Sequence, residues 1–118
     1  MKNKKFLNKE NLSNIFFGSN PIPMWIYTTS DKQILEVNDA AVDAYGYSKV
    51  EFSHLFYDDF IGEDIPSDFP DYSESELLKQ LSIHRASDGS SFVTLMVENP
   101  VTYNNKEAML VRSIRVFN

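Results

Sequence analysis

The stretch Pro21–Tyr47 constrains the fold more than any other part of the chain. Its first apolar run, 24–28 (MWIYT), is aromatic and β-branched, a composition typical of a strand. A second run, 34–37 (ILEV), follows after residues with turn chemistry at 30–32. The stretch therefore predicts two short strands joined by a turn.

A capped helix is expected directly after these strands. Asn38 offers a side-chain oxygen to the free N–H groups of a helix start. Three alanines in 39–45 let the helix lie close to the surface that it covers, and Gly46 can take the left-handed conformation that ends a helix. Ser48 and Glu51 are spaced as a capping box, which predicts a second short helix at 49–55.

The rest of the chain predicts three further strands, at 82–86, 91–97 and 108–117. A helix is expected from Ser73 through Leu81, before the first of them. Strands grouped on either side of a helical insert favour the α+β class. We expect a five-stranded antiparallel sheet with helices packed on one face.

An N-terminal helix is expected over 8–17, because Leu12, Ile15 and Phe16 share one face. The 118 residues correspond to one domain by the usual size range. We expect 1–20 to be an N-terminal cap helix and lead-in, and 21–118 to be the domain proper.

Charge and composition narrow the function. The net charge of −6 argues against nucleic-acid binding, and no stretch approaches the length of a membrane span, so neither contact is expected. Between Glu51 and Glu76 there are nine carboxylates and no Lys or Arg, which indicates a solvated acidic face or a weak divalent-cation site. The absence of cysteine excludes disulfides and weakly favours a reducing compartment.

No catalytic constellation is evident in the sequence. His54 and His84 are the only histidines, and no serine lies in a nucleophile-elbow pattern. His54 is expected on the surface and His84 in a structural position. The sequence therefore predicts no enzyme activity for this domain, no catalytic residues and no metal site.

Three blocks in order carry a family resemblance: NPIPMWIY (20–27), ILEVNDAAVDAYGYSKVEF (34–52) and HRASDGSSF (84–92). Together they resemble the PAS family of sensory domains, over roughly residues 12–117. The resemblance implies the PAS fold, in which one face of the sheet and the helices enclose an interior that can bind a small ligand.

The resemblance also implies which side chains face this interior. The candidate ligand-pocket residues are Trp25, Tyr27, Val37, Ala41, Tyr45, His84, Phe92, Thr94, Met96, Val111 and Ser113. The same pattern turns Leu35 and Met109 inward. The polar members could orient a ligand, or the aromatic members could simply fill the space.

Cofactors are judged by the same resemblance. Light sensors of this family that form a flavin adduct need a reactive cysteine, which is absent, and haem-binding members place a histidine on the helix corresponding to 73–81, which has none. We therefore expect no bound cofactor. A haem or noncovalent flavin sensor of redox state or gases remains the alternative function.

The outer face of the sheet is also apolar, at Val93, Leu95 and Val97. A sheet that is apolar on both faces needs cover on both. Either the N-terminal helix covers its own sheet, or a second copy of the chain does. We expect a homodimer whose interface contains Leu12, Ile15, Phe16, Val93, Leu95 and Val97.

The expected function is that of a cytoplasmic sensory or dimerisation module in a bacterial signal-transduction protein. Binding of a ligand or partner would pass a conformational signal to an effector domain of the same chain, of the histidine kinase or diguanylate cyclase type. Two departures from the family pattern concern this output. Thr28 and the tripeptide 115–117 stand where many members carry Asp and Asp-Ile-Thr.

Overall fold

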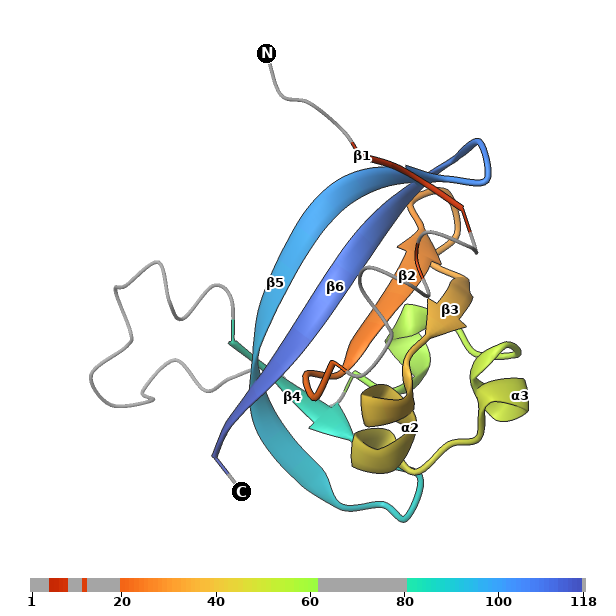
Figure 1. The fold of residues 1–118 in the computed structure, drawn as a ribbon. Helices are drawn as coiled ribbons and strands as arrows, with labels where there is room; N and C mark the ends of the chain where they lie inside the picture. Colours follow the sequence, from red (N-terminus) through yellow and green to blue (C-terminus); the bar gives the residue numbers. More distant parts are fainter. Residues whose placement is uncertain (1–4, 9–11, 13–19, 62–80, 118) are drawn as a thin grey trace.

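The computed structural model describes residues 5–8, 12, 20–61 and 81–117. One curled sheet dominates it, and two short helices lie on one side of the sheet (Figure 1). The strands are β1 (Lys5–Leu7), β2 (Met24–Thr28), β3 (Ile34–Val37), β4 (Leu81–Arg85), β5 (Ser91–Tyr103) and β6 (Lys106–Phe117). The helical elements are α2 (Asp39–Tyr45), α3 (Lys49–Phe52) and the 3₁₀ turn η2 (Tyr57–Asp59).

The five expected strands form the antiparallel part of this sheet. The strand order is β1-β5-β6-β2-β3, and β4 pairs with the first residues of β5 on the edge away from β6, the edge that β1 also uses. The long β5–β6 hairpin is its centre, and it turns at Asn104 and Asn105, both of which have positive φ. Asparagine tolerates that conformation better than most residues, so the hairpin turn follows from local sequence.

β1 is an addition that the sequence did not predict. Its three residues pair in parallel with Val101–Tyr103 of β5, which makes the sheet mixed. The expected N-terminal helix over 8–17 lies mostly outside the described residues. Leu12 is described, and its backbone N–H donates to the carbonyl of Asn8 at 2.9 Å. The expected helix at 73–81 also lies outside them, except that Leu81 is the first residue of β4.

Two hydrophobic clusters lie on the two faces of the sheet. The inner cluster lies between the sheet and the helical elements, and contains Trp25, Tyr45, Phe52 and Phe60. The outer cluster contains Leu7, Leu12, Met24, Ile26, Val101, Tyr103, Ala108 and Leu110. The chain therefore covers part of its own outer face with residues that precede β2.

A β-bulge corrects one expected side-chain direction. Ile26 pairs with Glu36 and Tyr27 pairs with Ile34, so Leu35 is the extra residue of β3. Leu35 was expected to point inward, but it packs on the outer cluster, and Ile34 takes the inward place. The phenol of Tyr103 donates to the carboxylate of Glu36, the residue after Leu35, at 2.6 Å. This hydrogen bond lies beside the bulge.

Candidate functional site

Asn38 fixes α2 against the sheet. Its Oδ1 accepts from the backbone N–H of Ala41 and from that of Met24, both at 2.9 Å, and its Nδ2 donates to the carbonyl of Ile22 at 2.8 Å. Asn38 is almost fully buried. One side chain thus caps the helix and ties it to β2, and this turns Ala41 and Tyr45 toward the interior.

The eleven candidate ligand-pocket residues come together in the inner core. All are buried: Trp25, Tyr27, Val37, Ala41, Tyr45, His84, Phe92, Thr94, Met96, Val111 and Ser113. They come from five strands and α2. The expected inward pattern of β4, β5 and β6 is therefore present in the structure, whereas a ligand role for these residues stays a prediction.

Aromatic rings pack closely around Trp25. Its ring centroid lies 5.5 Å from that of Tyr45 and 5.3 Å from that of Phe60, both edge-on, and 6.1 Å from that of Tyr57. Tyr57 and Phe60 were not among the sequence candidates, because the segment around η2 has no regular periodicity that assigns its side chains to a face. They form the helical side of the site.

A chain of three hydrogen bonds crosses this aromatic core. Thr94 Oγ1 and Ser113 Oγ are 2.6 Å apart, Ser113 Oγ and the Tyr45 hydroxyl 2.9 Å, and the Tyr45 hydroxyl and His84 Nδ1 2.6 Å. All four residues are buried. The chain joins side chains of β5, β6, α2 and β4.

Two buried nitrogen atoms of the site have no hydrogen-bond partner among the described residues. They are Trp25 Nε1 and His84 Nε2, and both side chains are fully buried. Burial lowers the pKa of His84 to about 4, so the imidazole is neutral at physiological pH. Buried polar atoms are normally hydrogen-bonded, so these two nitrogens are the part of the core best suited to hold a polar ligand.

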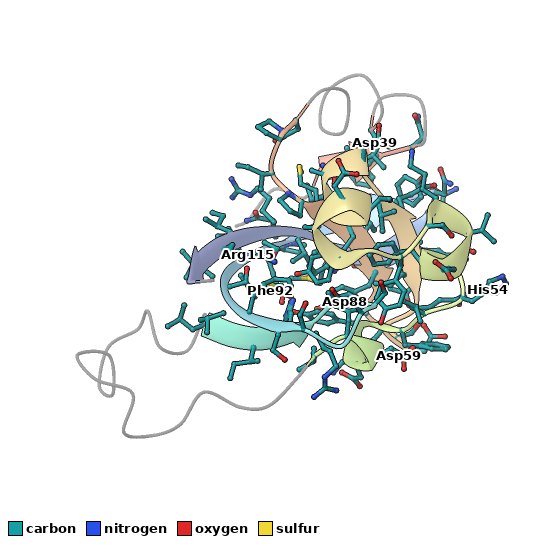
Figure 2. The ribbon with its side chains drawn as sticks, turned by 90° about the horizontal axis from the view of Figure 1, so that it is seen from below. Asp39, His54, Asp59, Asp88, Phe92 and Arg115 are labelled. Carbon is teal, nitrogen blue, oxygen red and sulfur yellow. The ribbon has the colours of Figure 1, made fainter. Side chains whose placement is uncertain are left out.

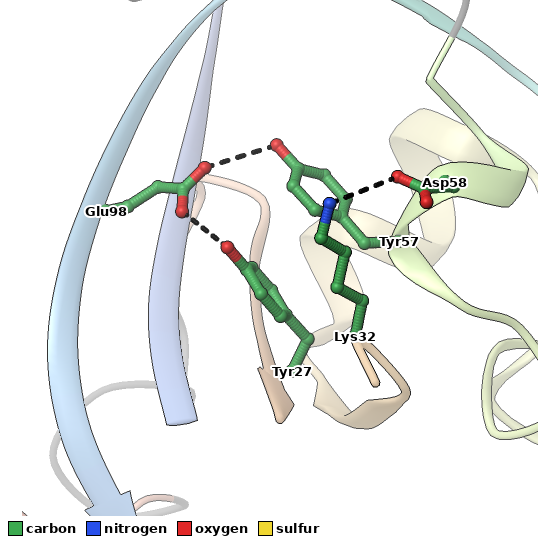
Figure 3. Close-up of polar contacts among 5 residues, drawn as sticks. All are labelled: Tyr27, Lys32, Tyr57, Asp58 and Glu98. Atoms are coloured by element: carbon green, nitrogen blue, oxygen red, sulfur yellow. Dashed lines mark hydrogen bonds and ion pairs between the residues drawn. The ribbon is translucent and has the colours of Figure 1, made fainter. Parts of the chain in front are cut away.

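Glu98 of β5 links the sheet to η2 through hydrogen bonds to two tyrosines (Figure 3). Its two carboxylate oxygens accept from the Tyr27 hydroxyl at 2.7 Å and from the Tyr57 hydroxyl at 3.3 Å. The two rings are stacked with centroids 4.8 Å apart. Burial and the adjacent carboxylate raise the pKa of both phenols, which stay neutral donors.

Arg115 stands where many family members carry Asp. Its guanidinium carbon lies 4.0 Å from the centroid of the Phe92 ring, a cation–π contact (Figure 2). Arg115 also lines an open surface cleft of about 710 Å³, together with Asn20, Pro21, Pro23, Asp39, Ala40, Asp43 and Ala44. The end of β6 is thus attached to the inner core through an aromatic ring rather than through a carboxylate.

The expected dimer residues lie in different places. Val93, Leu95 and Val97 are half-buried on the outer face of β5, next to Ile83 and Ile114 on the neighbouring strands. Ile15 and Phe16 lie outside the described residues. An interface role for Leu12 is not supported, because Leu12 is only 1% exposed and packs on the outer cluster of its own sheet.

Within the described part of the chain, no cluster of three or more His, Cys, Asp or Glu side chains is placed to hold a metal ion. No helix in the same residues is both long and apolar enough to cross a membrane. His54, which the sequence placed on the surface, is exposed on the segment after α3.

The PAS domain family model matches residues 10–87, which is more than half of the chain, so this chain belongs to the PAS family. No match was found among curated proteins. Solved structures agree with the family assignment at low sequence identity, which shows a shared fold.

Three of them are PAS domains that cover most of this chain. One, from a two-component sensor histidine kinase, has a TM-score of 0.62 at 18% identity, over 83% of this chain and 87% of that chain. Another, from an HTR-like protein of Haloarcula marismortui, has a TM-score of 0.67 at 16% identity, over 91% and 90%. The PAS domain of nitrogen regulation protein NR(II) from Vibrio parahaemolyticus gives 0.66 at 14% identity, over 89% and 98%.

Proposed function

We propose that this chain is a sensory module of a signal-transduction protein and binds a small molecule between its inner sheet face and its helical side. The observation that carries the proposal is the pair of buried, unpartnered nitrogens, Trp25 Nε1 and His84 Nε2, inside an aromatic enclosure. A core built only for stability gains nothing from leaving such groups without partners, since each costs about 1–3 kcal/mol.

The signal leaves through β6. A ligand at these nitrogens changes the packing of Tyr45 and His84, and the hydrogen-bond chain carries the change to Ser113 of β6. Arg115, two residues further along, rests on Phe92 of the same core. Ligand binding thus shifts the population of β6 conformations, and an effector domain of the same chain, of the histidine kinase or diguanylate cyclase type, reads that shift. The module itself has no catalytic role and works in the cytoplasm.

The domain proper is residues 21–118, with 1–20 as its lead-in. The lead-in belongs to the same folded unit, because β1 pairs with β5 and Leu12 packs on the outer cluster. A homodimer forms through the outer patch, which we define as Ile83, Val93, Leu95, Val97 and Ile114. The register places Ile83 opposite Val93 and Leu95 opposite Ile114, so the patch is continuous across three strands.

The direct test is native mass spectrometry of the purified protein, followed by identification of the small molecules that it releases. A stoichiometric organic molecule that is lost in a Trp25→Phe, His84→Gln double variant supports the proposal. A protein that carries nothing, and whose melting temperature no metabolite mixture raises, contradicts it.

A sensor that carries haem or noncovalent flavin is the second candidate. The observation that favours it is the unpartnered His84 Nε2, because an imidazole nitrogen that carries no proton can ligate haem iron. The absorbance spectrum between about 350 and 500 nm decides between the two. A flat spectrum that stays flat after haem or flavin is added removes the cofactor hypothesis.

A further inference from the structure

We infer that the interior site presents two N–H donors, from Trp25 and His84, and accepts a ligand through a neutral carbonyl oxygen. This inference rests on the proposed function, because it names the class of ligand for the same site. It follows from the direction of the hydrogen-bond chain, which fixes where the imidazole proton of His84 lies.

The direction of the chain is set at its far end, by Thr94. Within the described residues, the Thr94 hydroxyl has the Ser113 hydroxyl as its hydrogen-bond partner. Thr94 is fully buried, so it must donate to Ser113 or leave its proton without an acceptor. The reverse direction would leave both the Thr94 proton and the lone pair of His84 Nε2 unpaired, whereas this direction leaves only the N–H of His84 Nε2 unpaired. Thr94 therefore donates to Ser113.

The other bonds follow in order. The Ser113 hydroxyl has one proton and already accepts from Thr94, so it donates to the Tyr45 hydroxyl. Tyr45 in turn donates to His84 Nδ1. The imidazole is neutral, and since Nδ1 accepts, the single ring proton lies on Nε2. His84 Nε2 is then a donor, not an acceptor.

The second unpartnered nitrogen, Trp25 Nε1, can only donate. The two side chains that carry these N–H groups share an aromatic cover, which the rings of Tyr57 and Phe60 form. The ring of Phe60 is 5.3 Å from that of Trp25 and 5.6 Å from that of His84, and the ring of Tyr57 is 6.1 Å from both. A ligand must therefore present acceptor atoms to these two donors. An ammonium or other donor group would place its own N–H groups against those of Trp25 and His84.

Charge narrows the acceptor further. Neither nitrogen carries a positive charge. Among the described residues, the carboxylate of Glu98 contacts this cover, and it accepts hydrogen bonds from the hydroxyls of Tyr27 and Tyr57. A buried anion would face no cation on these two nitrogens, and burying an unpaired charge is far costlier than burying a neutral dipole. A ketone, ester or amide oxygen can accept hydrogen bonds from such donors without that cost. Its entry moves Tyr57 and Phe60, which also contact each other.

The first test measures the tautomer of His84 in the wild-type protein, labelled with ¹⁵N-histidine, at pH about 7.5. His84 is expected to show a protonated Nε2 and an unprotonated Nδ1. His54, the only other histidine, is exposed and serves as the internal reference in the same spectrum. A protonated Nδ1 on His84 would reverse the hydrogen-bond chain and overturn the inference, whatever the protein binds.

The second test uses cyclohexanone as the carbonyl probe and cyclohexylamine as the matched donor probe. Trp25 is the only tryptophan, so its indole N–H gives one resonance. Cyclohexanone should shift the N–H resonances of Trp25 and His84 downfield in a saturable way, and cyclohexylamine should not. In a Trp25→Phe variant, the His84 response should need about tenfold more ketone, since one hydrogen bond is lost.

The outcomes separate the inference from the proposed function. Binding of the amine in place of the ketone, or release of a native ligand with no carbonyl group, overturns the ligand class and leaves the sensory function standing. The expected tautomer combined with no binding of either probe and no released molecule overturns the ligand-binding function, and the inference with it.

Discussion

The Ser87 hydroxyl donates to the carbonyl of Gly46 at 2.9 Å, across 41 residues of sequence. The backbone N–H of Ser87 also donates to the carbonyl of Tyr45 at 2.8 Å. These two bonds attach the end of α2 to the β4–β5 turn. They bring Ser87 so close that a Cβ on Gly46 would lie 2.4 Å from its hydroxyl oxygen.

The first prediction concerns this contact. Gly46→Ala should destabilise the protein by more than Gly89→Ala, although both glycines have positive φ. A Cβ added at Gly89 would have no neighbouring atom within 4 Å, so its substitution costs only the conformational strain of about 1–2 kcal/mol. Gly46→Ala adds a clash of about 1–3 kcal/mol. Urea unfolding of the two variants measures the difference, and equal losses would show that Ser87 moves aside freely.

The second prediction concerns α2. Ala41 is fully buried in the inner cluster, so Ala41→Leu should overpack it and lower the free energy of unfolding by about 1–3 kcal/mol. Ala40→Leu is the matched control, because Ala40 is one position away and lines the open cleft. Thermal and urea unfolding should separate the two variants. A tolerated Ala41→Leu would mean that the interior has room for an additional isobutyl group.

The third prediction is a pH dependence that arises from His84. Its pKa is about 4 in the folded protein against 6.5 in the unfolded chain, so the unfolded state binds more protons between these values. The stability from this group is complete above pH 6.5 and falls as the pH drops. From pH 7 to pH 5 the loss should be about 2 kcal/mol.

The control for this effect is His84→Gln, in which the loss between pH 7 and pH 5 should shrink by that amount even if the variant is less stable overall. Tyr45 and Tyr57, the titratable side chains described in contact with His84, stay neutral in this range because burial raises the pKa of both. An unchanged pH slope in the variant would show that His84 is solvated and titrates normally.

The fourth prediction concerns assembly through the outer patch. Leu95→Lys places a charge at its centre in both copies of a two-fold dimer, and should shift the protein to monomer. Val50→Lys is the control, because Val50 is 70% exposed on α3. Sedimentation velocity of the wild type and both variants measures the association. A wild type that is monomeric at every concentration would rule out the proposed dimer.

Local chemistry made a large part of the fold predictable. The Asn38 cap, the Gly46 ending and the Ser48–Glu51 capping box are each contained within a few residues, and all are present. The facing pattern that the family resemblance implies likewise assigned Thr94 and Ser113 to the inner face, and both are buried there in the alternating strands β5 and β6.

The differences arise where strand pairing, irregular structure or a distant segment decides the position of a side chain. The Leu35 bulge depends on how β3 pairs with β2, and β1 is only three residues long and gains its partner about 96 positions later. Tyr57 and Phe60 lie in irregular structure, so no periodicity indicates their direction. Glu98, a charged residue in an apolar strand, would be expected in solvent, and only the fold brings its two tyrosine donors to it.

The order of strands has a consequence for synthesis on the ribosome. β1 pairs with β5, and β2 pairs with β6 as well as with the adjacent β3, so the earliest strands of the chain complete their pairing only with late residues. Until residues up to about Arg112 have emerged, the outer cluster lacks the residues that β5 and β6 contribute to it. Hydrophobic residues such as Met24 and Ile26 then stay exposed and can bind chaperones. The domain is expected to fold in one late step rather than progressively from its N-terminus.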